Sequence, residues 1–356
     1  MLLINNEDAN QVLGIDECIE VVETAFREEG LGRAVNRTKS QMHLPTSSRE
    51  RWYRFSSVEG GLRHAGVVAL RIKSDILCWP ESFGQSRNFY YCMEPNRYCG
   101  LILLFKAENG EPLALMNDGV IQHMRVAATA AVAAKRMARE DASVVGLLGS
   151  GGMAESHLRA YVAVRPVRLA KVFSPHREHR EQFAARMAEK LAIEVVPTHN
   201  PRDAVLNADI VATCTDTGEP ILFAEWLEPG MHVTSVNHRE IDTPVYGRLN
   251  RYVKYQSGLA ANYFTTPENW RPLSLGGGGQ EQERFLRASA AVKQDLTDLL
   301  VRQAPGREST DEINFFKSEG TGVQFAAVSD LAYRKCLEQN LGQPLPLDWF
   351  IQKIRN

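Results

Sequence analysis

A glycine-rich segment near the middle of the chain has the composition of a phosphate-binding turn. Residues Gly149-Ser150-Gly151-Gly152-Met153-Ala154 follow the pattern G-x-G-x-x-A. The first glycine permits a tight turn, the second lets the backbone approach a pyrophosphate, and the small alanine lets a helix pack closely on a strand. The apolar run SVVGLLG precedes the pattern and a helix-like segment follows it, as such a turn requires. We therefore expect dinucleotide binding at residues 149–154, with the phosphates facing the N–H groups that begin the helix.

The residues after the next predicted strand bear on which nicotinamide cofactor binds. An acidic side chain at that position holds the ribose 2′-hydroxyl and repels a 2′-phosphate. This chain has Ser174-Pro175-His176-Arg177 there, and the nearest carboxylate, Glu178, follows the arginine. A hydroxyl and a guanidinium suit a 2′-phosphate. We predict that Ser174 and Arg177 favour NADP(H), with NAD(H) as the alternative if Arg177 only begins a solvated helix.

Strand-like and helix-like segments alternate from residue 143 onward. The segments SVVGLLG, LAKVFSP, EVVPT, DIVATCT, HVTSVN and RYVKY are strand-like, and GMAESHLRAYVAV and HREHREQFAARMAEKL are helix-like. This alternation predicts a doubly wound parallel sheet, whose ligands bind at the carboxyl ends of the strands. The residues near those ends that we expect to bind the cofactor are Thr213, Thr215, Val236 and Asn237. The glycine run at 276–279 predicts a flexible loop, because no strand leads directly into it.

The N-terminal part of the chain has a different pattern. The segment IDECIEVVETAFREEGLG predicts an amphipathic helix, and short β-like runs follow it, with the hairpin signal Asn109-Gly110 between two of them. Next, the alanine-rich segment IQHMRVAATAAVAAKRMARE predicts a long helix. We expect a last helix, TGVQFAAVSDLAYRKCLEQ, to pack back on the N-terminal part. The predicted fold class is α/β, with a Rossmann domain over 119–314 and a discontinuous α+β domain, for dimerisation and substrate, over 1–118 and 315–356.

The composition limits the classes of partner. The 356-residue chain is 44% hydrophobic and 24% charged, and its net charge of −2 provides no basic field for nucleic acid or an anionic membrane. The N-terminus lacks the pattern of a secretory signal, and no run of about 18 apolar residues occurs. The six cysteines form no CxxC pair and no zinc spacing. We expect reduced thiols, no metal site and a cytoplasmic location.

The chain resembles the ornithine cyclodeaminase/mu-crystallin family over nearly its whole length. The segments that carry the resemblance are GLILLFKAENGEPLALMNDGVIQHMRVAATAAVAAKRMA, VGLLGSGGMAESHL, ADIVATCT, GMHVTSV and PGRESTDEINFFKSEGTG. The order of strand, hairpin, strand and helix in the first segment is more specific than the glycine turn. The resemblance implies a homodimer formed through the sheet of the N-terminal domain, and hydride exchange at the α-carbon of a small amino or imino acid.

The resemblance also implies where the substrate binds. Arg125 matches the family's helix arginine beside the cofactor, and Arg37 resembles an early arginine that also meets the substrate carboxylate. A planar guanidinium can hold both carboxylate oxygens and orient the α-carbon toward the nicotinamide. The family places a lysine near the substrate at the end of a strand, where this chain has Arg71 and Lys73 on one face of VVALRIKSD. The family spacing favours Arg71 and the residue type favours Lys73, which could donate a proton or hold an oxygen.

The sequence leaves the proton-transfer residue open. Ornithine cyclodeaminases have an aspartate after the strand that HVTSV resembles, and this chain lacks it. His238 or Glu240 could take that role, because either side chain can move protons near neutral pH in a suitable environment. The chain also has Gln122 and Val126 where the family often has threonines, and Phe325 where an aspartate is common. These differences disfavour the cyclodeaminase reaction.

Three functions remain open at this stage. The first is an NAD(P)-dependent oxidoreductase acting on the C–N bond of an α-amino or α-imino acid, of the imine reductase or amino-acid dehydrogenase type. The alternatives are an ornithine cyclodeaminase-type lyase that gives proline and ammonia, and a non-catalytic NADPH-binding protein like the crystallin members of the family. Aromatic residues of the β segments suggest a bulky or apolar substrate side chain, unless they serve the core or a dimer contact: Trp52, Trp79, Tyr90 and Tyr91.

Overall fold

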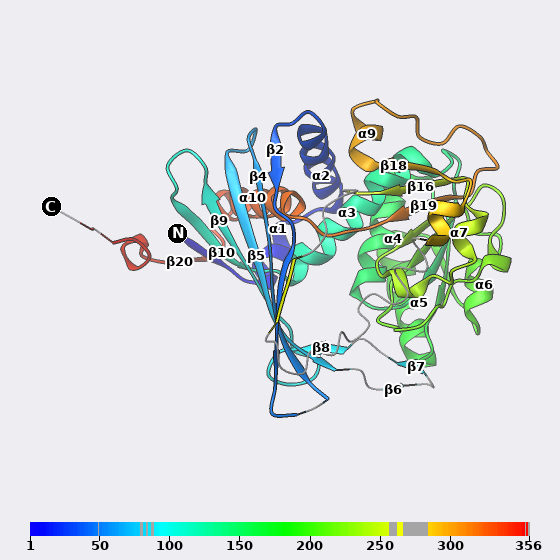
Figure 1. The fold of residues 1–356 in the computed structure, drawn as a ribbon, viewed down its shortest axis with the longest axis horizontal. Coiled ribbons are helices and arrows are strands. Elements are labelled where there is room, and N and C mark those ends of the chain that lie inside the picture. The colour runs from blue at the N-terminus through cyan, green and yellow to red at the C-terminus, as the bar shows by residue number, and fades with distance from the viewer. Residues whose placement is uncertain are drawn as a thin grey trace.

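Two large β-sheets with the helices that cover them make up the structure. The computed structural model describes residues 1–48, 50–78, 81–82, 85–86, 89–255, 262–265, 284–352 and 354. The two sheets lie side by side, and the long helix α3 (Gly119–Met137) runs between them (Figure 1). The predicted loop at 276–279 and Trp79 lie outside the described residues.

An eight-stranded sheet carries the glycine-rich turn. Its strands follow the order β13-β12-β11-β14-β15-β19-β16-β18, and each is parallel to its neighbours. The strands are β11 (Val144–Leu148), β12 (Leu169–Phe173), β13 (Glu194–Pro197), β14 (Ile210–Thr213), β15 (His232–Ser235), β16 (Arg251–Lys254), β18 (Val292–Asp295) and β19 (Asn314–Lys317). The helices that connect them are α4 (Gly152–Val164), α5 (Arg177–Leu191), α6 (Pro201–Val205), η1 (Ala224–Trp226), η2 (His238–Glu240), α7 (Val245–Arg248) and α9 (Leu296–Leu300). The strand order reverses at β11, which confirms the predicted doubly wound sheet.

The second sheet has ten strands and is mostly antiparallel. Its main path is β17-β3-β4-β5-β9-β10-β1-β20, while β2 pairs with β4 and β8 pairs with β5. The strands are β1 (Leu2–Ile4), β2 (Ala34–Asn36), β3 (Ser40–Pro45), β4 (Trp52–Leu62), β5 (Val67–Cys78), β8 (Phe89–Tyr91), β9 (Cys99–Lys106), β10 (Pro112–Asn117), β17 (Asn262–Thr265) and β20 (Gln343–Pro344). A separate pair joins β6 (Glu81–Ser82) to β7 (Gln85–Ser86). The predicted hairpin at Asn109-Gly110 is confirmed, because β9 pairs with β10 and Gly110 has a φ of 77°.

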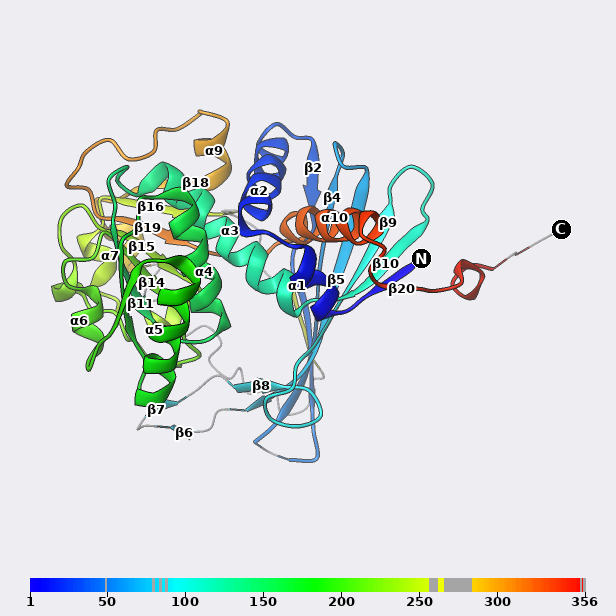
Figure 2. The same cartoon turned by 180° about the vertical axis from the view of Figure 1, so that it is seen from behind.

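Three helices cover one face of the ten-stranded sheet (Figure 2). They are α1 (Asn6–Val12), α2 (Ile15–Gly30) and α10 (Gly322–Glu338); a one-turn helix η3 (Leu347–Trp349) follows near the C-terminus. The start of α10 touches the backbone of β4, since a Cβ on Gly60 would lie 2.2 Å from the carbonyl carbon of Gly322. Apolar side chains of these helices and of the sheet, such as Phe26, Ile102 and Val323, form one core. The last helix therefore packs on the N-terminal part, as predicted.

The predicted domain boundary at residue 314 is too early. Residues 314–317 form β19, which pairs with β15 and β16 in the eight-stranded sheet, and the chain crosses to α10 only afterwards. With a partner on each side and with Phe315 and Phe316 buried, β19 is an interior strand of that sheet. The remaining division into domains stays a prediction.

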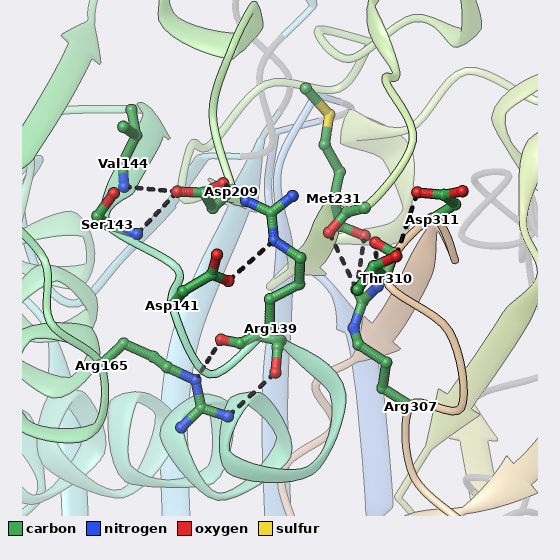
Figure 3. A network of polar contacts seen from close by, with 12 residues as sticks. Arg139, Asp141, Ser143, Val144, Arg165, Asp209, Met231, Arg307, Thr310 and Asp311 are labelled. Carbon is green, nitrogen blue, oxygen red and sulfur yellow. Dashed lines mark hydrogen bonds and ion pairs between the residues drawn. The ribbon is translucent and has the colours of Figure 1, made fainter.

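A hydrogen-bond network holds the C-terminal end of α3 against the eight-stranded sheet (Figure 3). Arg165 donates to the carbonyl oxygens of Arg139 at 2.7 Å and Ala134 at 2.8 Å, and Arg307 donates to that of Met137 at 2.7 Å. The carboxylate of Asp209 pairs with Arg139 and accepts from the N–H groups of residues 143 and 144, at the start of β11. The carbonyl of Met137 is one that the helix end leaves without a donor from the helix itself. These contacts also fix the direction in which α3 approaches the other sheet.

Two properties concern the whole described chain. None of its helices combines the length and the apolar character that a bilayer crossing needs. All six cysteines carry free thiols.

Candidate active site

The glycine-rich turn after β11 has the geometry that its sequence predicts. Gly149 has a φ of 117°, and a Cβ there would lie 2.4 Å from the carbonyl oxygen of Cys214. Its N–H donates to the carbonyl of Phe173 at 2.8 Å, which joins the turn to the end of β12. Only glycine fits this position, because the left-handed region and the close backbone both exclude a side chain.

The start of α4 suits a pyrophosphate. Gly151 is the N-cap residue, no side chain caps the helix, and a Cβ on Gly151 would meet nothing within 4 Å. Ala154 is fully buried in the core of the sheet, while Met153 is partly buried against that core and Ser150 lies in the turn. The N–H groups of the first helical turn therefore have no side-chain cap, and the space beside Gly151 is open. Uncapped N–H groups at a helix start bind phosphates in Rossmann folds.

The residues predicted to choose between the two cofactors lie at the end of β12. Ser174 is buried, and its carbonyl oxygen accepts a hydrogen bond from Arg180 at 3.0 Å. Arg177 is the first residue of α5; its side chain is 77% exposed and pairs with Glu181 at 2.7 Å. An exposed pair of this kind is weak, so the guanidinium can exchange its partner for a phosphate.

Glu240 joins the loops that follow β14 and β15. One carboxylate oxygen accepts hydrogen bonds from the N–H and the hydroxyl of Thr215 at 2.5 and 2.6 Å. The other accepts from the Thr213 hydroxyl at 2.8 Å and from the N–H of Asn237 at 3.1 Å. The side chain is completely buried. Burial raises the pKa of its carboxyl to about 7, although the hydrogen bonds from Thr215, Thr213 and Asn237 act in the opposite direction.

This arrangement bears on three of the predicted site residues. Thr213, Thr215 and Asn237 bind the Glu240 carboxylate, so it is this carboxylate that shapes the loops at the predicted cofactor edge. Val236 is partly buried beside the same core as Met153. The backbone of His238 lies in η2, and its side chain is outside the described part of the structure.

A cluster of charged side chains lies on the face of the ten-stranded sheet that α10 covers in part. On β5, Arg71, Lys73 and Asp75 alternate on one face, opposite Val58, Ser56 and Arg54 of β4. Asp75 is buried; it pairs with Arg54 at 2.6 Å and with Lys73 at 3.2 Å. The ring of Tyr90 lies 4.4 Å from the Arg54 guanidinium and 5.7 Å from the Lys73 ammonium, so this aromatic residue contacts cations.

Arg125 of α3 reaches this cluster. Its guanidinium donates to the side-chain oxygens of Gln122 and Gln324, both at 2.8 Å. It also lies 4.8 Å from the ring of Phe325, while Arg71 lies 5.2 Å from the same ring. Burial and the charge of Arg71 lower the pKa of Arg125 to about 9. Gln122 and Phe325, two of the three residues at which the chain departs from the family pattern, thus both touch the predicted carboxylate-binding arginine.

Helix α3 also reaches the glycine turn. A Cβ on Gly152 would lie 2.9 Å from the ring of His123, two residues before Arg125. Two residues later on α3, the guanidinium of Arg125 lies beside Gly320, in the segment that follows β19. Helix α3 therefore carries one residue that lies against the glycine turn and another that lies in the cation cluster.

The structure separates Arg37 from the other predicted substrate residues and adds Lys39. The Arg37 side chain is 75% exposed and faces Glu59 at 3.8 Å. Lys39 is partly buried and has no hydrogen bond or ion pair within the described residues. Burial lowers the pKa of Lys39 to about 7, and four nearby cations add to this effect: Arg54, Arg71, Lys73 and Arg125. The alternation of Lys39, Gln41 and His43 was the only signal in the sequence that could have placed this lysine on the site face.

The part of the chain that the structure describes contains no group of three or more His, Cys, Asp or Glu side chains close enough together to hold a metal ion.

Comparisons with known proteins show the family to which the chain is similar. The model of the ornithine cyclodeaminase/mu-crystallin family matches residues 95–340, more than half of the chain. A putative dehydrogenase from Rhizobium meliloti (strain 1021) is 31% identical over 249 residues, covering 68% of this chain and 72% of the relative. A Delta(1)-pyrroline-2-carboxylate reductase from Bacillus cereus is 25% identical over 351 residues, covering 97% of this chain and 99% of the relative.

A solved structure shares the fold over nearly the whole chain. Delta(1)-pyrroline-2-carboxylate reductase from Thermococcus litoralis, in complex with NADH and L-proline, has a TM-score of 0.80 and 25% sequence identity. The match covers 97% of this chain and 100% of that chain.

Proposed function

Because the chain belongs to the ornithine cyclodeaminase/mu-crystallin family, we propose that it is an NAD(P)-dependent oxidoreductase acting on the C–N bond of an α-amino or α-imino acid. The observation that carries the proposal is on α3, where His123 packs against Gly152 of the glycine turn and Arg125 enters the cation cluster. A nicotinamide cofactor on the turn and a carboxylate on Arg125 would therefore be neighbours. The reductase relatives from Bacillus cereus and Thermococcus litoralis support this reaction type.

Two residues of the site have separate roles in imine reduction: Arg125 binds the substrate, and Lys73 transfers the proton. The reduced nicotinamide, when bound, supplies the hydride, and the balance of the reaction also requires one proton. Arg125 binds the substrate carboxylate through two N–H groups and orients the α-carbon. Lys73 supplies the proton in the reducing direction and accepts it in the oxidising direction. Burial lowers the pKa of Lys73, partly offset by Asp75, which brings its proton transfer closer to neutral pH.

We also propose that NADP(H) is the preferred cofactor. Ser174 and Arg177 follow β12, and no carboxylate stands between them to repel a 2′-phosphate. Titration of the protein with NADPH and NADH, followed by cofactor fluorescence, measures the preference. We expect the dissociation constant of NADPH to be lower, and Arg177→Ala to remove the difference. Tighter binding of NADH by the unchanged protein would contradict the preference.

A homodimer through the ten-stranded sheet is part of the same proposal. Val68, Leu70 and Ile72 alternate with Arg71 on β5 and therefore lie on the sheet face opposite α10, where Val68 is 38% exposed. Leu103 and Leu101 of β9 pair with Leu70 and Ile72 on that face. Sedimentation equilibrium gives the oligomeric state, and a monomer at micromolar concentration would contradict the dimer. A cytoplasmic location, proposed from the six free thiols, is checked by cell fractionation.

A spectrophotometric assay tests the reaction itself. Purified protein is mixed with NADPH, a 2-oxo acid and ammonia or methylamine, and the absorbance at about 340 nm is followed. We expect net oxidation of NADPH. Ammonia release from ornithine without net cofactor change would favour the lyase, and NADPH binding without turnover of any substrate would favour the non-catalytic alternative.

The variant Arg125→Met connects the assay to the structure. Loss of a charge-assisted pair predicts a fall in kcat/KM of about 10- to 100-fold. The dissociation constant of NADPH stays the same, because Arg125 contacts no residue of the glycine turn. Lys106→Met is the control, since the side chain of Lys106 is 43% exposed and pairs with Glu108 on the β9–β10 hairpin. Equal activity of the two variants would contradict the role of Arg125.

A further inference from the structure

The charge balance of the cation cluster points beyond a single carboxylate. Five cationic side chains face the site: Lys39, Arg54, Arg71, Lys73 and Arg125. Among the described residues, two carboxylates form ion pairs with these cations. Asp75 pairs with Arg54 and Lys73, and Asp118 pairs with Arg71 at 2.6 Å. Within the described residues, Arg125 and Lys39 have no acidic partner; Arg125 is bound by amide oxygens, and Lys39 by no group at all.

We propose that the substrate is a dicarboxylic 2-imino or 2-amino acid, with its α-carboxylate on Arg125 and its second carboxylate on Lys39. The proposal rests on the function proposed above and names the substrate class of the same site. A monocarboxylic substrate would leave one of these two cations without an anion. A second carboxylate neutralises it.

The position of Lys39 supports this assignment. Lys39 directly precedes β3, whose residues Gln41 and His43 pair with Ser56 and Arg54 on the cluster face. Residues that alternate along a strand share a face, so the side chain of Lys39 extends toward the same surface. Arg37, on the same alternation, has its side chain turned to Glu59 and 75% exposed. Of the two basic residues Arg37 and Lys39, Lys39 is therefore the one that lies near the cation cluster.

Phe325 lies against two of the cations and brings no negative charge to them. Its ring lies within 4.8 Å of the Arg125 guanidinium and 5.2 Å of the Arg71 guanidinium, and it is 1% exposed. An acidic residue at this position would neutralise one of them. A buried surplus of like charge is unfavourable until an anion enters, and the lowered pKa of Lys39 is the sign of that cost. The bound dianion supplies the missing negative charge.

Matched acids and amides test the proposal. The NADPH-loaded enzyme is assayed with ammonia or methylamine and either oxaloacetate or 2-oxoglutarate, and with the monoamide of each acid, in which the distal carboxylate is replaced by a neutral group of the same size. We expect kcat/KM to be about 10- to 100-fold higher for at least one of the two acids than for its amide. In Lys39→Met the preference disappears because the acid is impaired and the amide is not. Lys106→Met retains the full preference.

Other results overturn the assignment. Equal use of acid and amide by the unchanged enzyme excludes a second carboxylate site. If Lys39→Met lowers kcat/KM equally for the acid and for its amide and also displaces the pH profile, Lys39 acts in proton transfer instead. A binding readout separates this proposal from the proposed reaction: with NADPH present, succinate or glutarate should raise the melting temperature more than the corresponding monoamide. If that difference is seen while no 2-oxo acid is reduced, the dicarboxylate site stands and the proposed reaction fails.

Discussion

The carboxylate of Asp118 accepts two hydrogen bonds from the guanidinium of Arg71, at 2.6 and 2.8 Å. The two side chains are 9% and 10% exposed. Asp118 is the residue before α3, and Arg71 lies in the middle of β5, so this pair sets the position at which α3 leaves the ten-stranded sheet. The placement of Arg125 depends on it, because Arg125 lies two turns into the same helix.

Removal of Asp118 leaves Arg71 buried without its anion. We expect Asp118→Ala to lower the free energy of unfolding by on the order of 3 kcal/mol, because breaking one side of a buried pair strands a charge. Chemical denaturation measures the change. Glu108→Ala, which removes the partner of exposed Lys106, should change the same quantity by less than about 1 kcal/mol. Similar losses in the two variants would show that the Arg71 pair is not special to the fold.

Two glycines of the turn should respond differently to alanine. Gly149→Ala places a Cβ 2.4 Å from the Cys214 oxygen at a positive φ, so we expect loss of stability of at least about 2 kcal/mol. Gly151→Ala meets open space at a φ of −88°, so the melting temperature should stay the same. The added methyl group would occupy the space of the pyrophosphate, and the dissociation constant of NADPH should rise at least about tenfold. A Gly151→Ala protein that binds NADPH normally would place the cofactor elsewhere.

Glu240 should act by holding loops. Both of its oxygens accept backbone N–H groups, from Thr215 and Asn237, and a glutamine can satisfy only one of the two. We expect Glu240→Gln to cost about 2 kcal/mol of stability and to weaken NADPH binding. At saturating NADPH, kcat should stay within about threefold of the unchanged enzyme, since the carboxylate has no free oxygen for substrate. A large fall in kcat with normal NADPH binding would restore the predicted acid/base role.

The same carboxyl group predicts a pH dependence of stability. Its pKa is raised from 4.5 to about 7 on folding, so the folded protein holds one more proton than the unfolded chain between these values. The contribution of this group is therefore fully present below about pH 4.5 and is lost as the pH rises through about 7. Denaturation of the unchanged protein and of Glu240→Gln across this range isolates the effect, because the variant lacks the group. An identical slope in both proteins would show that Glu240 is ionised throughout.

Lys39 predicts a pH dependence of ligand binding. Its pKa is lowered to about 7 in the absence of ligand, so the ammonium form declines as the pH rises above that value. Among the described residues, the charged and titratable groups near it are Arg54, Arg71, Lys73, Arg125 and His43. Asp75 and Asp118 form ion pairs with Arg54 and Arg71 of this group. A second carboxylate needs the ammonium form, and we expect the inhibition constant of succinate or glutarate to rise toward tenfold per pH unit above pH 7. In Lys39→Met the constant should be higher at pH 6 and nearly independent of pH; the same slope in both proteins would assign the titration to another group.

The local elements of this protein follow from the sequence. The turn at Gly149, the hairpin at Asn109-Gly110 and the alanine-rich α3 each depend on residues close together in the chain, where φ preference and hydrophobic periodicity act directly. The alternation of strands and helices was sufficient for the doubly wound sheet. The boundary after β19 was misplaced, because Asn314–Lys317 is a strand by virtue of two partners, β15 and β16, that come from distant segments.

The sequence by itself determined that a glycine-rich turn precedes a helix, and it offered several basic residues as candidates for binding an anion, namely Arg37, Arg71, Lys73 and Arg125. Only the tertiary structure decided which of them share a site. Arg37 and Lys39 are two residues apart and of the same charge, yet one side chain is exposed and the other lies among four cations. Likewise Glu240 could be a proton carrier in the sequence, and it is the packing of β14 against β15 that surrounds its carboxylate with donors. The physical reason is that charge and burial are properties of neighbours in space, and long-range pairing of strands chooses those neighbours.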